Sequence, residues 1–385
     1  MDRITADFIY SPGFLLREHY MEVEEDGTIV ALRPLDGTEK RLIRYEGVLF
    51  PGFVNAHCHL ELSAFRGKLK TGLGMTAFAQ AIVQERKTIS EEAHQYAIYD
   101  ALREAFFTGT VAIGDICNTD ITAAAKKDFS KLFTHSFIEL IGLDATKAEG
   151  IVEKGEALVL AFEEGKSSLC LHAPYSVSAE LRDRVYDKSP FLTSVHLLES
   201  QAERDLFERG EGDFIPFYEA IQVPLPQFSQ AFSHQHILEN LPKDIPILFV
   251  HCLEARREEI ELLGTTFPQA YFCLCPKSNV YIHDKMPDLS RFESVKDRIC
   301  LGTDSLASNS SLRMIEEIQL LAKHYPELEL HTLLKWGTTH GAMALGKGKD
   351  FGAFAPESKP GVNLLAGIDQ ESLALGADTR VSKLY

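Results

Sequence analysis

The chain has 385 residues, enough for one large domain with a small one or for two of ordinary size, and its 45% apolar and 25% charged residues argue against a disordered or fibrous protein. Its 39 basic and 56 acidic side chains give a net charge of −17, which argues against nucleic acid and anionic membranes as partners and means that an anionic substrate needs a local basic pocket. No apolar run approaches the roughly 18 residues of a membrane span, and the N-terminus lacks the pattern of a secretory signal. The number of cysteines, seven, is odd, and we expect reduced thiols in a cytoplasmic protein.

The first fifty residues form short apolar runs separated by turns, and Asp26-Gly27 between two of these runs is a hairpin signal. The chain returns to this texture after Gly346, where glycine and proline interrupt any helical period. We therefore expect residues 1–48 and 347–385 to form one small β domain from both chain termini.

Between these ends, short apolar runs alternate with amphipathic stretches of helical period. One such stretch begins at Ser90, a residue type that caps helix N-termini, and Glu91 and Glu92 follow it in the first turn. This alternation predicts an α/β fold, a (β/α)₈ TIM-like barrel over residues 49–346, with a doubly wound sheet as the alternative. The expected strands are Val48–Asn55, Thr110–Ile116, Leu132–Ile141, Ser168–His172, Leu192–His196, Ile247–His251, Ala270–Leu274 and Arg298–Gly302.

The first run leads into the pair His57-x-His59. On a strand, residues i and i+2 point to the same face, whereas on a helix they diverge by about 200°. Two imidazoles on one face at the end of a strand are suitable ligands for a divalent metal ion. Taken alone, the pair is a weak signal for a metal, and histidines of the core are the more common explanation.

Three further runs end in a side chain that can bind a metal: His196, His251 and Asp304. In a barrel of this kind, the active site lies at the C-terminal ends of the strands. Each residue by itself has a simpler interpretation, a hydrogen-bonded core histidine or a capping aspartate. The repetition of the pattern at four strand ends favours a metal-dependent active site.

Four segments carry a resemblance to a known family: PGFVNAHCH at 51–59, HLLESQAE at 196–203, FVHC at 249–252 and LGTDSLASN at 301–309. In this order they resemble the amidohydrolase superfamily, and most closely its branch of aromatic-ring aminohydrolases, which includes nucleoside, guanine and cytosine deaminases and chlorohydrolases. The similarity extends from about Leu49 to Gly346, and the flanking β segments match the small domain of that branch.

The resemblance implies a single bound divalent ion, zinc first and iron second. It also implies that His251 lies beside the attacking water and that Glu199 carries protons to and from the substrate ring, although Glu199 also suits the first turn of a helix. Asp304 near the ion can accept a proton from that water. The run at 168–172 contains no lysine, which agrees with one ion rather than two. The implied ligands are His57, His59, His196 and Asp304.

Three residues are candidates for substrate contacts at the mouth of the barrel. His172 ends the fourth run, and in related deaminases the matching histidine faces the substrate; a structural role is the alternative. Glu61 follows the H-x-H pair closely and can bind a ring N–H or remain a solvated loop acid. Arg66 lies in the same loop region.

The predicted function is hydrolytic deamination of a small-molecule nitrogen heterocycle. Resemblance to the aminofutalosine and adenosyl-nucleoside deaminase group places a 6-aminopurine nucleoside derivative first and a free purine or pterin base second. A metal-dependent amide hydrolase or a ring dechlorinase would keep every ligand and stays open as an alternative. A barrel that survives only as a binding protein would have lost a ligand, and none is missing. A homodimer is the family expectation.

Overall fold

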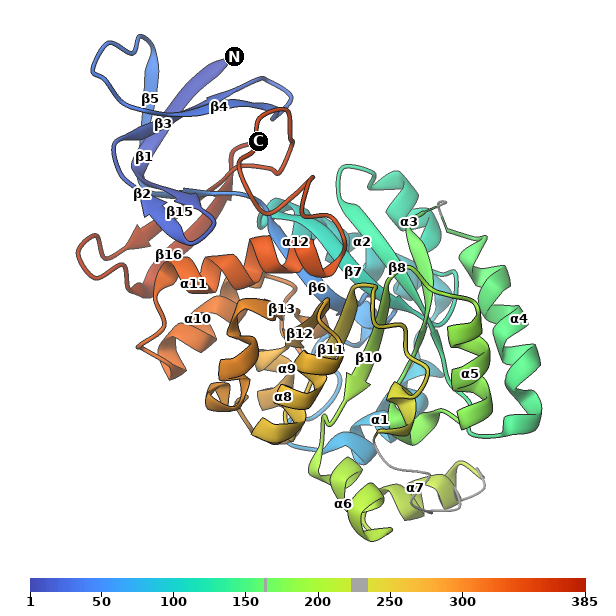
Figure 1. Ribbon diagram of the computed structural model, residues 1–385. Coiled ribbons are helices and arrows are strands. Elements are labelled where there is room, and N and C mark those ends of the chain that lie inside the picture. Colours follow the sequence, from blue (N-terminus) through green and yellow to red (C-terminus); the bar gives the residue numbers. More distant parts are fainter. Residues whose placement is uncertain (163–164, 223–234) are drawn as a thin grey trace.

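The computed structural model describes residues 1–162, 165–222 and 235–385. Parallel strands follow one another in chain order at the centre of the larger part of the molecule, and helices surround them (Figure 1). These strands are β6 (Phe53–His59), β7 (Thr110–Cys117), β8 (Phe133–Leu140), β9 (Ser167–Leu171), β10 (Thr193–Leu197), β11 (Ile247–His251), β12 (Ala270–Leu274), β13 (Ile299–Leu301) and β14 (Asp304–Ser305).

The strands form two parallel sheets that meet at both edges. One sheet has the order β14-β6-β7-β8-β9 and the other β10-β11-β12-β13. At one junction the backbone N–H of His196 donates to the carbonyl of His172 at 2.9 Å. At the other, β14 continues the chain beyond β13 and pairs with β6, so that Asp304 lies opposite Cys58. The predicted TIM-like barrel is therefore confirmed, with its eighth strand divided into β13 and β14.

Helices cover the outer face of the barrel strands, and side chains fill the inside, which explains why a strand such as β7 is mostly apolar and buried along its whole length. The Ser90 hydroxyl accepts from the backbone N–H of Ala93, so the predicted cap of α2 is confirmed. No helix among the described residues is both long and apolar enough to cross a membrane. The helices are α1 (Met75–Arg86), α2 (Glu91–Phe107), α3 (Ala123–Asp128), α4 (Ala148–Val159), α5 (Ala179–Asp187), α6 (Gln201–Arg209), α7 (Phe214–Ala220), α8 (Arg257–Thr266), α9 (Pro276–His283), α10 (Met314–His324), α11 (Leu330–Lys335) and α12 (Gly341–Ala344).

Both chain termini lie in one separate sheet beside the barrel (Figure 1). The order is β16-β15-β5-β1-β3-β4, and β2 pairs with β1. Parallel pairing of β1 with β5 and antiparallel pairing of β5 with β15 join the two ends of the chain. The strands are β1 (Asp2–Ser11), β2 (Phe14–Leu16), β3 (His19–Val23), β4 (Ile29–Pro34), β5 (Leu42–Phe50), β15 (Asn363–Ile368) and β16 (Leu375–Lys383).

The expected strand Val48–Asn55 is divided between the two sheets. Its first residues complete β5 in the terminal sheet, and β6 of the barrel begins only at Phe53. Pro51 separates the two strands because it has no N–H to donate to a sheet. As a consequence, His57 and His59 lie within the first barrel strand rather than after it.

Gly47 is a point where the terminal sheet tolerates no side chain. Its φ is +117°, and a Cβ atom there would lie 2.1 Å from the carbonyl oxygen of Leu365 on β15. We expect Gly47→Ala to lower the free energy of unfolding by about 1–3 kcal/mol more than Gly13→Ala, because overpacking adds to the backbone strain. Gly13 is the matched control, since its φ is +91° and nothing lies within 4 Å of its added Cβ. Equal losses in urea unfolding would contradict a close approach of β5 and β15.

Candidate active site

Four polar side chains from three strands meet at one end of the barrel. The Nε2 atoms of His57 and His59 on β6 are 3.2 Å apart. Asp304 on β14 places Oδ1 3.4 Å from Nε2 of His59 and 3.8 Å from Nε2 of His57. Ligand atoms of the two β6 histidines and of His196 on β10 all lie within 4.8 Å of one another. The four implied ligands are thus neighbours, although they are up to 247 positions apart in the sequence.

The outer atoms of two of these side chains, His196 and Asp304, are held by neighbouring residues, so that their inner atoms face the group. Nδ1 of His196 lies 3.0 Å from the carbonyl oxygen of His172, which leaves Nε2 for the centre of the group. Oδ2 of Asp304 accepts from the hydroxyls of Ser278 and Ser308, which leaves Oδ1 toward the histidines. Outer hydrogen bonds of this kind fix the orientation and tautomer of metal-binding side chains.

The protonation state of the group suits a cation. Burial, with the other histidines adding to it, lowers the pKa of His57 well below its usual value, and burial lowers the pKa of His196 to about 3. Burial raises the pKa of Asp304, but His59, His251 and the serine hydroxyls outweigh it, so that the pKa of this carboxyl is lowered overall. Neutral imidazoles and an ionised carboxylate are the forms that bind a divalent metal.

Glu199 and His251 face each other beside the four donors. Nε2 of His251 lies 3.3 Å from Oε1 of Glu199, and both side chains are buried. Nδ1 of His251 lies 3.0 Å from Oδ1 of Asn279, an acceptor, so the ring proton is on Nδ1 and Nε2 is free to accept. Burial, together with the negative charges of Asp304 and Glu203, raises the pKa of Glu199 well above its usual value. The pair can therefore hold a proton at neutral pH.

The loop that carries Glu199 is held by a second buried carboxylate. Leu198 has φ of +49°, a conformation that side-chain-bearing residues rarely adopt. The two oxygens of Glu203 on α6 accept from the backbone N–H groups of Leu198 at 3.1 Å and of Glu199 at 3.0 Å. Ser200 caps the same helix by accepting from the N–H of Glu203. Burial raises the pKa of Glu203 to about 7, against the opposing effect of these N–H groups.

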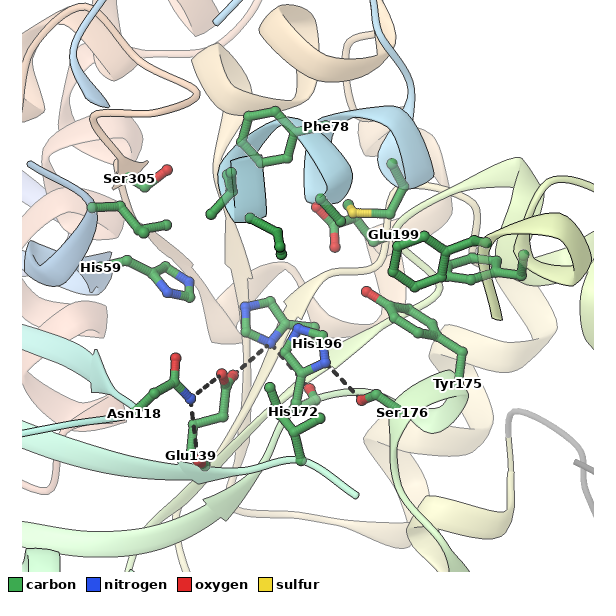
Figure 2. A pocket seen from close by; sticks show the side chains of 18 of the residues that line it. His59, Phe78, Asn118, Glu139, His172, Tyr175, Ser176, His196, Glu199 and Ser305 are labelled. Carbon is green, nitrogen blue, oxygen red and sulfur yellow. Dashed lines mark hydrogen bonds and ion pairs between the residues drawn. The ribbon is translucent and has the colours of Figure 1, made fainter. Parts of the chain in front are cut away.

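A cavity of about 440 Å³ opens above the four donors and is lined mostly by apolar side chains. Figure 2 shows Phe78 at the top, Tyr175 at the right and His59 at the left, with His196 and Glu199 toward the middle. The size and the apolar walls with a few convergent polar groups are typical of a small-molecule site.

Of the three expected substrate contacts, only His172 lines this cavity. Its Nδ1 lies 2.7 Å from Oγ of Ser176 (Figure 2), and burial lowers its pKa to about 3.

Glu61 and Arg66 have other partners. Oε1 of Glu61 accepts from the backbone N–H groups of Asn118 and Thr119, so this carboxylate shapes the loop after β7 instead of facing the cavity. Arg66 donates to Glu104 at 2.6 Å and lines a different hollow. Neither Glu61 nor Arg66 is among the residues that line the cavity, and their contact with the substrate stays a prediction.

Among the cavity residues that were missed in the sequence, Asn118 and Glu139 lie nearest to the donor group. The amide of Asn118 donates to Oε2 of Glu139 at 3.0 Å, and Oε1 of Glu139 lies 3.4 Å from Nδ1 of His196 (Figure 2). A signal existed for Glu139, since it is an ionisable residue inside the apolar run of β8. Glu139, His172 and His196 also form a close group of potential ligands.

Comparisons with known proteins agree with this site. A model of the amidohydrolase family matches residues 48–378. The chain is 31% identical over 324 residues to an aminodeoxyfutalosine deaminase of Nitratiruptor sp., covering 79% of this chain and 78% of that protein. It is 30% identical over 312 residues to an adenosine deaminase of Helicobacter pylori, covering 77% and 74%.

Solved structures share the fold. The Helicobacter pylori aminofutalosine deaminase in complex with methylthio-coformycin superposes with a TM-score of 0.84 at 23% identity, over 100% of both chains. The zinc complex of atrazine chlorohydrolase from Arthrobacter aurescens gives 0.75 at 16% identity, over 99% of this chain and 93% of that one.

Glu203→Gln tests the support of the Glu199 loop. A glutamine offers one oxygen to two N–H groups, so one buried N–H loses its partner, and we expect the free energy of unfolding to fall by about 1–3 kcal/mol. Amide hydrogen exchange at Leu198 and Glu199 should accelerate. Glu208→Gln on the same helix is the matched control, since Glu208 is half-exposed and its ion pairs with Arg204 and Arg256 contribute little. Unchanged exchange in Glu203→Gln would contradict this role.

Proposed function

Because the chain belongs to the amidohydrolase family, we propose that it is a metal-dependent hydrolytic deaminase of a 6-aminopurine nucleoside derivative. The observation that carries the proposal is the pairing of Glu199 with His251 beside three imidazoles and a carboxylate, at the closed end of an apolar cavity. The reaction replaces the ring amino group by oxygen from water and releases ammonia.

A single divalent ion fits the donor set. His57, His59, His196 and Asp304 would hold it, and three nitrogen ligands with one carboxylate favour zinc, with iron second. When bound, such an ion lowers the pKa of water toward 7 and stabilises negative charge in the transition state.

Three residues of the chain, Asp304, Glu199 and His251, can accept or donate the protons that the reaction transfers. Asp304 is ionised and can accept a proton from the attacking water, while Ser278 and Ser308 keep its carboxylate in place. Glu199 is protonated, because burial raises its pKa, and can donate to a ring nitrogen of the substrate. Protonation of that nitrogen makes the adjacent carbon electrophilic. His251, fixed by Asn279, can accept a hydrogen bond through Nε2 from Glu199 or from the water.

The two relatives named above support the choice of substrate, since both are named as deaminases of adenine nucleosides or of a related compound. Within the cavity, His172, Asn118 and Glu139 offer polar groups beside the closed end, where the sugar of a nucleoside can bind. We further propose a cytoplasmic location, because all seven cysteines are buried free thiols, and a homodimer.

The proposal is tested by ammonia release from adenosine, 5′-extended adenosines, free adenine and a pterin, with a simple amide and a chlorotriazine as the competing chemistries. We expect adenine nucleosides to have the highest kcat/KM. Glu199→Gln should retain the metal and lower kcat by about 10²–10⁴-fold, because glutamine cannot transfer a proton. Glu254→Gln is the control, a partly buried glutamate paired with Lys285. Near-normal turnover in Glu199→Gln, or hydrolysis of the amide or the triazine alone, would overturn the proposal.

Metal content tests the ligand set. Elemental analysis of the purified protein should find one divalent ion per chain, and His57→Gln should lose most of it, because one of four ligands is removed from an open site. His135→Gln is the matched control: His135 is also buried, but it is bonded to Ser168 outside the donor set. A full complement of metal in His57→Gln would show that His57 is not a ligand.

A further inference from the structure

A buried glutamate on α10 lies outside the cavity, and each of its carboxylate oxygens has a hydrogen-bond partner. Glu317 is 0% exposed and is not among the residues that line the cavity. Its Oε2 accepts from the backbone N–H of Lys277 at 2.9 Å, and its Oε1 accepts from the side-chain amide of Asn309 at 2.8 Å. The ammonium group of Lys277 pairs with Glu316 instead. Glu317 is therefore compensated for its burial by hydrogen bonds from two separate segments of the chain.

The first of these segments is the start of α9. The N–H of Lys277 lies in the first turn of that helix, where no carbonyl of the helix can accept it, so the carboxylate on α10 satisfies it. The hydroxyl of the next residue, Ser278, donates to Oδ2 of Asp304. Oδ1 of Asn279, one position further, lies 3.0 Å from Nδ1 of His251. A shift of this end of the helix would therefore move both supports of the site together.

The second segment is the chain on both sides of Asp304. The amide of Asn309 donates to Glu317 and also to the carbonyl oxygen of Thr303 at 2.9 Å. Thr303 directly precedes Asp304, and Ser308, the neighbour of Asn309, donates to Oδ2 of Asp304 at 2.9 Å. Asp304 has φ of +56°, a conformation that persists only where the surroundings hold it. The carboxylate of Glu317 thus also restrains the segment that carries Asp304.

We propose that Glu317 is a positioning residue: by holding both segments, it keeps Asp304 and His251 in the orientations that the reaction needs. This inference rests on the proposed function and deepens it. Glu317 lines no part of the cavity, so its effect passes through the hydrogen bonds of the two segments. A carboxylate suits this place because each of its oxygens faces an N–H donor. A residue that only stabilised the fold would not affect the chemistry of the site once the chain has folded.

The test compares Glu317→Gln with Glu316→Gln in the zinc-loaded protein. Glutamine fits the same space, but its NH₂ group faces one of the two donors, so one of the held segments is released. With adenosine as substrate, we expect Glu317→Gln to lower kcat about tenfold and to leave KM within about twofold. The dissociation constant of Zn²⁺, measured by competition with a chelator, should rise about tenfold, because Asp304 is a predicted ligand. Glu316→Gln is the matched control, since Glu316 is bonded to the side chains of Lys277 and Ser311, and it should stay within about twofold of wild type.

Two double-mutant cycles show whether Glu317 acts through the serines that hold Asp304. Glu317→Gln is combined with Ser278→Ala in one cycle and with Ser308→Ala in the other. In at least one cycle, the double variant should lose less kcat than the product of the two single losses, because both changes loosen the same contact with Asp304. Losses that multiply in both cycles would overturn the proposal. So would a Glu317→Gln variant that unfolds at a lower urea concentration but keeps the kcat and the Zn²⁺ affinity of wild type.

The remaining outcomes separate this inference from the proposed function. If Glu317→Gln does not fold, Asn309→Ala removes one of its two partners and carries the same expected losses, and wild-type values in that variant would contradict the role of Glu317. If the wild-type protein releases no ammonia from any nucleoside, the proposed function fails, and chelator competition decides the role of Glu317 by itself. Weaker binding of Zn²⁺ in Glu317→Gln would then support it, and an unchanged dissociation constant would overturn it.

Discussion

The structure depends on the convergence of three imidazoles, two of them buried, and one carboxylate on strands β6, β10 and β14. Polar groups taken out of water need partners, and here the inner atoms of four side chains face one another. A divalent cation would satisfy all of them together, because burial lowers the pKa of His57 and of His196 while the pKa of Asp304 is lowered as well. The barrel provides this arrangement by placing strands that are distant in the sequence side by side.

Backbone strain accompanies this convergence. Leu198, His251 and Asp304 all have positive φ, and each lies at or just beyond the C-terminal end of a barrel strand. Such conformations are unfavourable by about 1–3 kcal/mol each, and persist where the surroundings hold them. The hydrogen bonds of Glu203 to the backbone, of Asn279 to His251 and of Ser278 to Asp304 are such restraints. Restraints of this kind hold the reacting groups in fixed positions, which favours catalysis by preorganised groups.

The remaining cavity separates two kinds of recognition. At the closed end, hydrogen-bonding and ionisable side chains surround the space where bonds change. Toward the mouth, the walls formed by α1 and α7 are mostly apolar. They can bind a ligand by burying its apolar surface, which does not fix the orientation of the ligand as hydrogen bonds do. The net charge of −17 disfavours the approach of anions in general, and among the described residues that line this cavity Arg86 is the only lysine or arginine.

The sequence by itself determined the order of strands and helices, the barrel and the residues that end its strands. Hydrophobic period and residue spacing are local properties of the sequence, and the C-terminal ends of parallel barrel strands lie at one face. The sequence was therefore enough to predict that five residues lie close together: His57, His59, His196, His251 and Asp304. Only the tertiary structure decided the surroundings of these residues. Glu61 and Arg66 follow the H-x-H pair closely, yet one bonds to the loop after β7 and the other to Glu104 on α2. Arg86 was not singled out, and it reaches the cavity because α1 packs with its apolar face inward. The physical reason is that the direction of a long side chain depends on which distant element offers it a partner, and neither periodicity nor spacing encodes that choice.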